Sequence, residues 1–133
     1  MISKEELIQI AIDARERSYS PYSGFAVGAA LACNDGSVYI GANVENASYP
    51  LCMCAERNAI YSAMMDGKTR EDMVALAIVA DTEGPCSPCG ACRQVIHELF
   101  PSDAPIYLAN LGGERMTTNA VELLPFAFDG RDL

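Results

Sequence analysis

Residues 73–100 read MVALAIVADTEGPCSPCGACRQVIHELF, which is an apolar run, a turn-rich loop and a helix-forming segment in succession. Met73–Ala80 predicts a strand buried on both faces, because a strand with one face in water alternates apolar and polar residues. The loop ends at Pro88, and Cys89–Phe100 predicts a helix that stops before the next proline. A buried strand followed by a helix is typical of layered α/β folds.

The residues before this unit predict another helix and a β-hairpin. Ser3 and Glu6 form a capping box at the start of an amphipathic segment, so we expect a helix over residues 4–18. Phe25–Cys33 and Ser37–Ala42 predict two strands, because the Asn-Asp-Gly sequence between them favours a tight turn.

The remaining elements complete a mixed sheet. Cys54–Asp66 predicts a second helix that ends at a glycine, and Ala104–Asn110 and Arg115–Thr117 predict two further strands. Asn119 caps a last short helix that ends at Pro125. The order αββαβαβ(β)α implies a three-layer α/β/α fold with a mixed five-stranded sheet and helices on both faces.

The length favours a single domain over residues 1–133. Half of the residues are apolar and the mean hydropathy is +0.10, which is more apolar surface than a chain this short buries by itself, so we expect subunit contacts. No apolar run approaches the roughly 20 residues of a membrane-spanning helix. The N-terminal sequence MISKEELIQI is acidic and amphipathic, unlike a signal peptide. We expect a cytoplasmic protein that does not contact membranes.

The charge and the cysteines narrow the class of function. Nine basic and eighteen acidic residues give a net charge of −9, which repels polyanions, so a nucleic-acid substrate is not expected. The chain has six cysteines. In a cytosolic protein, clustered cysteines hold metal more often than they form disulfides.

Two of the predicted helices begin with cysteines. Cys89 and Cys92 stand at positions i and i+3, which share one helix face, and a helix N-terminus favours the ionised thiolate. Cys54, at the start of the other helix, can supply a third thiolate. The alternative is a structural zinc site of four thiolates, completed by Cys52. The cysteines alone do not decide between these two kinds of site.

A glutamate two residues after Cys54 favours the catalytic kind of site. In the first turn of its helix, Glu56 can reach a metal-bound water without coordinating the metal, which is where a general acid/base must lie. A ligand-x-Glu motif followed by Pro-Cys-x-x-Cys is the known pattern of zinc deaminases. A zinc-stabilised binding module without catalysis has no use for this glutamate.

Five segments extend this pattern over nearly the whole chain: Ser20–Val27 (SPYSGFAV), Asn43–Tyr49 (NVENASY), Cys54–Asn58 (CAERN), Ser87–Gln94 (SPCGACRQ) and Glu122–Pro125 (ELLP). In order and spacing they resemble the homotetrameric cytidine deaminases. The resemblance implies that family's fold and one Zn²⁺ per chain. It assigns Cys54, Cys89 and Cys92 to the metal, Glu56 to proton transfer, Asn43 and Glu45 to the ribose hydroxyls, and Phe25, Val44 and Ala55 to the rest of the substrate pocket.

The reaction that the resemblance implies is the hydrolytic deamination of cytidine and deoxycytidine to uridine and deoxyuridine plus ammonia, in pyrimidine salvage. The substrate would be a free nucleoside. The alternative is a related aminopyrimidine nucleoside deaminase of the blasticidin S type. Asn43, Glu45 and Phe25 argue against that alternative, because they match the residues that contact ribose and base in the cytidine enzymes.

The resemblance also implies a homotetramer with shared active sites, in which a phenylalanine after the ELLP motif enters the pocket of a neighbour. Where the family typically has Gly-Ala-Phe, this chain has Phe126-Ala127-Phe128. The register favours Phe128 as the supplied side chain, with Phe126 as the alternative.

Arg57 is expected to tune the charge of the metal site. Zinc with three thiolates carries a net charge of −1 and is a poorer Lewis acid, so a cation beside the sulfurs would restore its activity. We expect Arg57 to donate hydrogen bonds to Cys54 and Cys89. The other cysteines, Cys33, Cys52 and Cys86, are expected to be packing residues, and His97 a surface or satisfied core residue.

Overall fold

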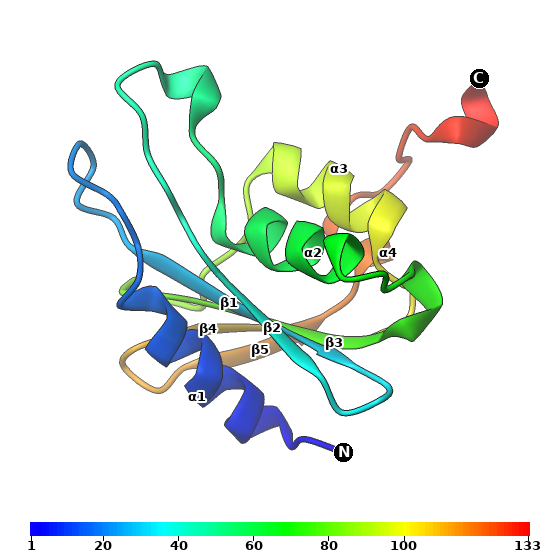
Figure 1. The fold of residues 1–133 in the computed structure, drawn as a ribbon, viewed down its shortest axis with the longest axis horizontal. Coiled ribbons are helices and arrows are strands. Elements are labelled where there is room, and N and C mark those ends of the chain that lie inside the picture. The colour runs from blue at the N-terminus through cyan, green and yellow to red at the C-terminus, as the bar shows by residue number, and fades with distance from the viewer.

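The computed structural model describes residues 1–133 as a five-stranded sheet with helices on both faces (Figure 1). The predicted order of elements is confirmed. In chain order the elements are α1 (Lys4–Arg15), β1 (Val27–Cys33), β2 (Val38–Ala42), α2 (Ala55–Met65), β3 (Met73–Ala80), α3 (Gly90–Leu99), β4 (Ile106–Asn110), β5 (Arg115–Thr118) and α4 (Ala120–Leu123). Tyr49–Leu51, Arg70–Asp72 and Gly130–Asp132 form short 3₁₀ helices that the sequence patterns do not predict.

Several elements are shorter than predicted, most clearly α1, β1 and β4, and β4 begins at Ile106 rather than at Ala104. α1 ends at Arg15 rather than at residue 18, because the next three N–H groups bond to carbonyls three positions earlier, in a tighter turn. β1 begins at Val27 rather than at Phe25. The Phe25 carbonyl instead accepts a hydrogen bond from the side chain of Asn43, so this residue belongs to a loop.

The sheet is mixed, as predicted, with the strand order β2-β1-β3-β4-β5. β3 and β4 are parallel and α3 forms the crossover between them, whereas the other neighbouring strands are antiparallel. This crossover brings the start of α3 to the carboxyl end of β3. Open α/β sheets usually bind their ligands at that edge.

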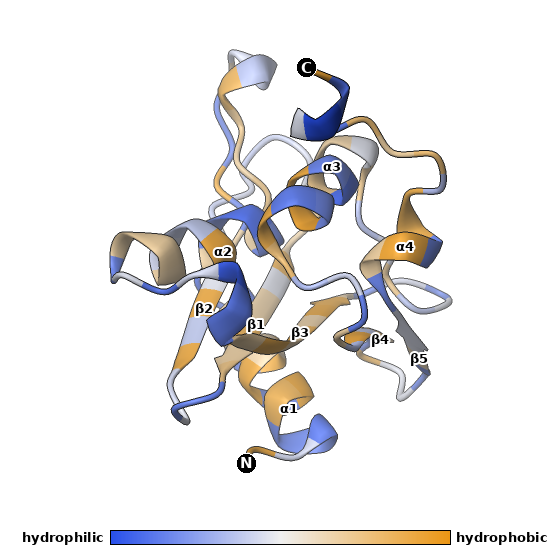
Figure 2. Ribbon diagram, turned by 90° about the vertical axis from the view of Figure 1, so that its right-hand side faces the viewer, coloured by the Kyte–Doolittle hydropathy of each residue, from blue (hydrophilic) through white to orange (hydrophobic).

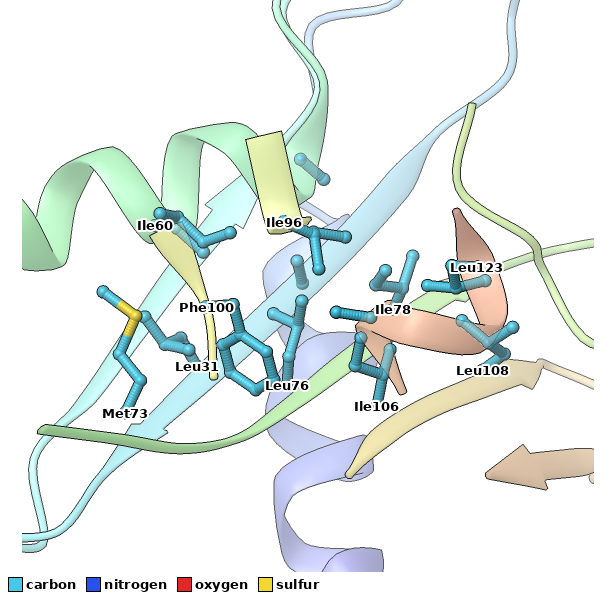
Figure 3. Close-up of a cluster of buried hydrophobic side chains, with 14 of the residues drawn as sticks. Leu31, Ile60, Met73, Leu76, Ile78, Ile96, Phe100, Ile106, Leu108 and Leu123 are labelled. Carbon is cyan, nitrogen blue, oxygen red and sulfur yellow. The ribbon is translucent and has the colours of Figure 1, made fainter. Parts of the chain in front are cut away.

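The sheet is buried on both faces, by α1 on one side and by α2, α3 and α4 on the other (Figure 1). Leu76 and Ile78 of β3 belong to the larger core cluster under α2, α3 and α4, which Figure 3 shows. Ala77 and Val79 belong to the smaller cluster under α1. Because alternate residues of β3 enter opposite cores, the strand has no polar residue.

Gly41 fixes how closely α2 lies on β2. A Cβ atom at this position would lie 2.2 Å from the carbonyl oxygen of Ala55 and 2.6 Å from the amide nitrogen of Ala59. The first turn of α2 therefore rests directly on the strand backbone. Any side chain at Gly41 would displace the turn that follows Cys54.

Two loops, residues 18–26 and residues 43–54, project beyond the sheet at the end where β3 finishes (Figure 1). They carry large apolar side chains in exposed positions, including Tyr22, Tyr49 and Leu51. No helix in the molecule has the length and apolar character needed to cross a membrane.

Candidate active site and metal centre

Cys54 and Cys89 occupy the N-cap positions of α2 and α3, with extended backbone conformations. Neither thiol makes a capping hydrogen bond to its own helix, so both sulfurs are available as ligands. Cys92 lies in the first turn of α3 and is fully buried. Two helix starts from different parts of the chain thus deliver three thiols to one place.

The three sulfurs fit a zinc ion. Cys54 Sγ lies 3.9 Å from Cys89 Sγ, and Cys89 Sγ lies 3.3 Å from Cys92 Sγ. All three ligand atoms lie within 4.8 Å of one another. A tetrahedral site with Zn–S bonds of about 2.3 Å separates its sulfurs by roughly 3.8 Å, so little rearrangement is needed.

The four-thiolate alternative is wrong, because Cys52 does not join the cluster. Its sulfur accepts a hydrogen bond from the Asn46 N–H at 3.3 Å and lies 3.5 Å from the Asn46 carbonyl oxygen. Cys52 therefore holds the loop before α2, rather than acting only as a packing residue. Cys33 lies in the larger hydrophobic core, as expected.

Of the three thiols, Cys54 is the one whose surroundings favour the ionised form. A hydrogen bond from Cys92 and the contact with Arg57 lower the pKa of Cys54 to about 5, while donating that hydrogen bond and burial raise the pKa of Cys92. A bound dication would hold all three groups as thiolates.

Arg57 contacts one of its two predicted partners. Its Nη2 donates to Cys54 Sγ at 3.3 Å, but it makes no hydrogen bond to Cys89. The neighbouring thiolate raises the pKa of Arg57 further, so the residue is a permanent cation beside the cluster. Its Nε atom is buried without a hydrogen-bond partner.

Glu56 lines the same site. The residue is only 3% exposed, and burial raises the pKa of its carboxyl group. It makes no ion pair in the molecule. A buried carboxyl group that is not used to hold the fold together is typical of catalytic sites.

A pocket of about 190 Å³ connects Glu56 with the cysteines. Phe25, Asn43 and Ala55, which the family resemblance assigns to the substrate, line it, whereas Val44, Glu45 and Phe128 do not. The residues that line the pocket are Phe25, Val27, Asn43, Cys54, Ala55, Glu56, Cys86, Ser87, Pro88 and Cys89.

Asn43 organises the loop that carries Phe25. Its Oδ1 accepts from the Val27 N–H at 2.8 Å and from the Ser18 hydroxyl at 2.5 Å. Its Nδ2 donates to the Phe25 carbonyl at 2.8 Å. An amide nitrogen has two hydrogens, so one donor of Asn43 is left for a ligand.

Glu45 holds the same loop from its other end. Its carboxylate accepts from the N–H groups of Tyr22 and Ser23, at 3.0 and 3.1 Å, and from the Ser23 hydroxyl. These bonds, the hydroxyl first, lower the pKa of Glu45, so it is an anion. Val44 pairs with Met53 through two backbone hydrogen bonds, which connect the two ends of the loop at residues 43–54.

The two phenylalanines after the ELLP motif lie outside the pocket of their own chain and are exposed. Phe126 has a φ of 56°, a left-handed conformation that favours glycine. The family resemblance implies a glycine at this position, and the role of Phe128 in a neighbour's pocket stays a prediction.

Sequence reasoning missed three parts of the pocket wall: Val27, Cys86 and the Ser87-Pro88 pair. Burial raises the pKa of Cys86 to about 11, so this thiol is neutral. The sequence patterns predict a packing residue at Cys86, and only the path of the loop shows that it lines the pocket. Ser87 and Pro88 belong to the segment SPCGACRQ, and their position before Cys89 was the available signal.

Comparisons with known proteins agree with this site. A family model described as the cytidine and deoxycytidylate deaminase zinc-binding region matches residues 1–108. The cytidine deaminase of Halalkalibacterium halodurans is 54% identical over 132 residues, which cover 99% of this chain and 98% of that protein. The cytidine deaminase of Sporosarcina psychrophila is 52% identical over 129 residues, which cover 97% and 93%.

Solved structures show the same fold. The crystal structure of cytidine deaminase from Burkholderia pseudomallei matches with a TM-score of 0.94 at 50% identity, over 96% of this chain and 100% of that one. The crystal structure of cytidine deaminase from Mycobacterium tuberculosis matches with a TM-score of 0.81 at 37% identity, over 97% and 99%. The chain therefore belongs to the cytidine deaminase family, and the matched zinc-binding region contains its three-thiol cluster and Glu56.

Proposed function

We propose that the protein catalyses the hydrolytic deamination of cytidine and deoxycytidine to uridine and deoxyuridine, with release of ammonia. The single observation that carries this proposal is the placement of a buried carboxyl group, Glu56, in one small pocket with a three-thiol zinc site. Its cytidine deaminase relatives supply the substrate class.

The mechanism follows from the position of Glu56. Zinc, when held by Cys54, Cys89 and Cys92, supplies the Lewis acidity that makes a water molecule nucleophilic at neutral pH. The Glu56 carboxylate takes a proton from the attacking water and delivers it to N3 of the cytosine ring as a C4–O bond forms. Glu56 then transfers the second water proton to the amino group, and the C4–N bond breaks to release ammonia.

The other pocket residues would bind and orient the nucleoside. Phe25 and Ala55 offer apolar surface to the base, and the remaining Nδ2 donor of Asn43 is available for a ribose hydroxyl. We include Val44 and Glu45 among the substrate residues on the family pattern. They lie outside the enclosed pocket, so their contacts would be made at its mouth, where the sugar emerges.

A homotetramer with shared active sites is part of the proposal. Ligand pockets usually measure roughly 300–1,000 Å³, so a pocket of about 190 Å³ suits a base better than a whole nucleoside. A neighbour would complete it. The exposed side chains of Tyr22, Tyr49 and Leu51 offer apolar surface for such contacts, and Phe128 is the side chain that we expect a neighbour to supply.

The proposed setting is pyrimidine salvage in the cytoplasm, with no membrane or nucleic-acid partner. All six cysteines are free, and three of them would bind zinc as thiolates, which suits a reducing compartment. The alternative activity, on a blasticidin S type nucleoside, is not favoured by any side chain that we identify in the pocket.

An ultraviolet assay of cytidine loss tests the proposal. The purified protein should convert cytidine to uridine, lose this activity with a strong zinc chelator and regain it when zinc is restored. Blasticidin S should be a much poorer substrate in the same assay. Failure of the zinc-loaded protein to convert cytidine or deoxycytidine would refute the assignment.

A further inference from the structure

The chain that follows α4 is tied to α3 at two successive residues. Gln94 Nε2 donates to the Phe128 carbonyl at 2.8 Å, and His97 Nε2 lies 2.8 Å from Asp129 Oδ2. The side chains of His97 and Asp129 are 17% and 13% exposed. Figure 2 shows the C-terminal turn beside α3. Phe128 itself is 58% exposed, so its ring is presented to the surroundings while its backbone is held.

The other end of this segment is tied to α3 as well. Arg93 Nη1 donates to the Leu123 carbonyl at 3.0 Å, while its Nε and Nη2 donate to the Pro88 carbonyl and the Ser87 hydroxyl, at 2.9 and 2.6 Å. The guanidinium group therefore links the wall of the pocket with the end of α4. Its three bonds leave residues 125–127 as an arch between two fixed points.

The arch has no hydrogen bonds of its own. No N–H, carbonyl or side-chain group of residues 125–127 is bonded within the chain, and Phe126 is in a left-handed conformation. Ordering such a segment costs backbone conformational entropy. The contacts at Phe128 and Asp129 therefore hold the end of the arch that carries Phe128.

We propose that His97 and Asp129, with Gln94, form a clamp that holds Phe128 ready for the active site of a neighbouring subunit. These three are positioning residues, since none of them lines the pocket of its own chain. The inference rests on the proposed shared active site. Its new content is the assignment of this role to His97, which the sequence indicates only as a surface or core residue.

Charge supports the clamp. Hydrogen bonds from Arg131 and then from His97 hold the pKa of Asp129 below its usual range, so Asp129 is a carboxylate that accepts from His97. The Arg131 side chain is 83% exposed and forms its ion pair in water, where such pairs contribute little. Arg131→Ala is thus a matched control, because it removes three side-chain contacts to the Asp129 carboxylate and none to α3.

The test compares steady-state kinetics of zinc-loaded variants. Asp129→Ala and His97→Ala should each raise KM for cytidine roughly tenfold, as expected for losing a hydrogen bond to a charged group, with kcat, zinc content and oligomer mass unchanged. His97→Gln keeps a donor and should recover most of the affinity. Arg131→Ala should have the KM of the unmodified protein.

Mixing subunits distinguishes the loss of Phe128 positioning from a general loss of function in the Asp129→Ala subunit. Asp129→Ala subunits should be mixed with Glu56→Gln subunits, which are catalytically dead but keep an intact clamp. A population of sites with the KM of the unmodified protein should appear, because the dead subunit supplies a correctly held Phe128 to its neighbour. A clamp that supports only its own pocket cannot be rescued in this way.

The outcomes distinguish a failure of the clamp from a failure of the shared active site on which it rests. If Phe128→Ala leaves KM unchanged, the proposal that a neighbour supplies Phe128 is wrong, and the clamp is refuted with it. If Phe128→Ala raises KM while Asp129→Ala, or Asp129→Asn should the former fail to fold, leaves it unchanged, only the clamp is wrong. A raised KM that mixing does not restore also overturns the clamp.

Discussion

Among single residues, the cysteines show most directly how position decides chemical role. Cys54, Cys89 and Cys92 share one cluster, Cys86 lines the pocket beside it, and Cys52 bonds to a loop backbone. All are the same side chain within a short stretch of sequence. Their surroundings make some of them ligands and leave Cys86 a neutral thiol.

We therefore expect zinc content to separate Cys92 from Cys86. Cys92→Ser should reduce bound zinc from about one ion per chain to a small fraction, because serine is a poor zinc ligand and three protein ligands are needed. Cys86→Ser is the matched control and should retain full zinc. Metal analysis of the two purified variants checks this, and loss of zinc from Cys86→Ser would show that the ligand set is wrong.

The spacing of residues predicted the ligand cluster, but not the bonds around the substrate loop. An i, i+3 pair and a ligand-x-Glu motif have fixed geometry on a helix, so Cys89, Cys92 and Glu56 could be placed from the sequence. Asn43 and Glu45 also hold backbone groups of the loop at residues 18–27. Those bonds depend on a loop conformation that no local pattern determines.

Among the elements, the close contact between α2 and β2 places one of the three zinc ligands, Cys54, and also Glu56. Cys54 precedes the first turn of α2, and that turn rests on the backbone at Gly41. The sequence predicted both elements but not their approach, which depends on two segments meeting without a side chain between them. A glycine inside a strand can mark a bulge or a close backbone approach, but it does not indicate which segment approaches.

Gly41→Ala should therefore damage both stability and metal binding. Forcing a methyl group into a packed site typically costs about 1–3 kcal/mol, and here the clash is with backbone atoms that cannot rotate away. Chemical denaturation and zinc analysis measure the two effects. Gly112→Ala is the control, since its Cβ would meet only the Asn110 side chain, at 3.6 Å or more. Equal stability of the two variants would contradict this packing argument.

The predicted bounds of an element match the observed bounds best where the element is buried on both faces. Met73–Ala80 has the predicted bounds, because its apolar side chains fill two cores. α1 and β1 are shorter than predicted at the ends where they enter the loop around Tyr19–Phe25. Helix and strand ends depend on individual backbone hydrogen bonds, which hydrophobic periodicity does not encode.

For the whole molecule, the net charge of −9 bears on substrate choice. A phosphate on the sugar would bring negative charge toward Glu45 and toward an acidic protein, and like-charge contacts cost several kcal/mol. We expect kcat/KM for cytidine to exceed that for CMP by about a hundredfold or more. Steady-state kinetics on cytidine, deoxycytidine, CMP and dCMP measure this ratio, and similar values for nucleoside and nucleotide would rule out the charge argument.

Assembly is the second property of the whole molecule. Light scattering should give the mass of four chains, since oligomers usually close with point-group symmetry and the projecting loops offer apolar surface. Phe128→Ala should raise KM for cytidine without loss of zinc, whereas Phe126→Gly, which suits the left-handed backbone, should not. A monomeric protein that still turns over cytidine would exclude shared sites.

Ammonia release from cytidine by Glu56→Gln, measured beside the unmodified protein at equal zinc content, is the most direct test of Glu56 as the proton carrier. Glutamine keeps the shape of the buried side chain but cannot shuttle a proton, so kcat should fall by roughly a hundredfold to ten-thousandfold. Circular dichroism and zinc analysis should give the same values for both proteins. If Glu56→Gln retains more than about a tenth of the original kcat, Glu56 is not the proton carrier and the proposed mechanism is wrong.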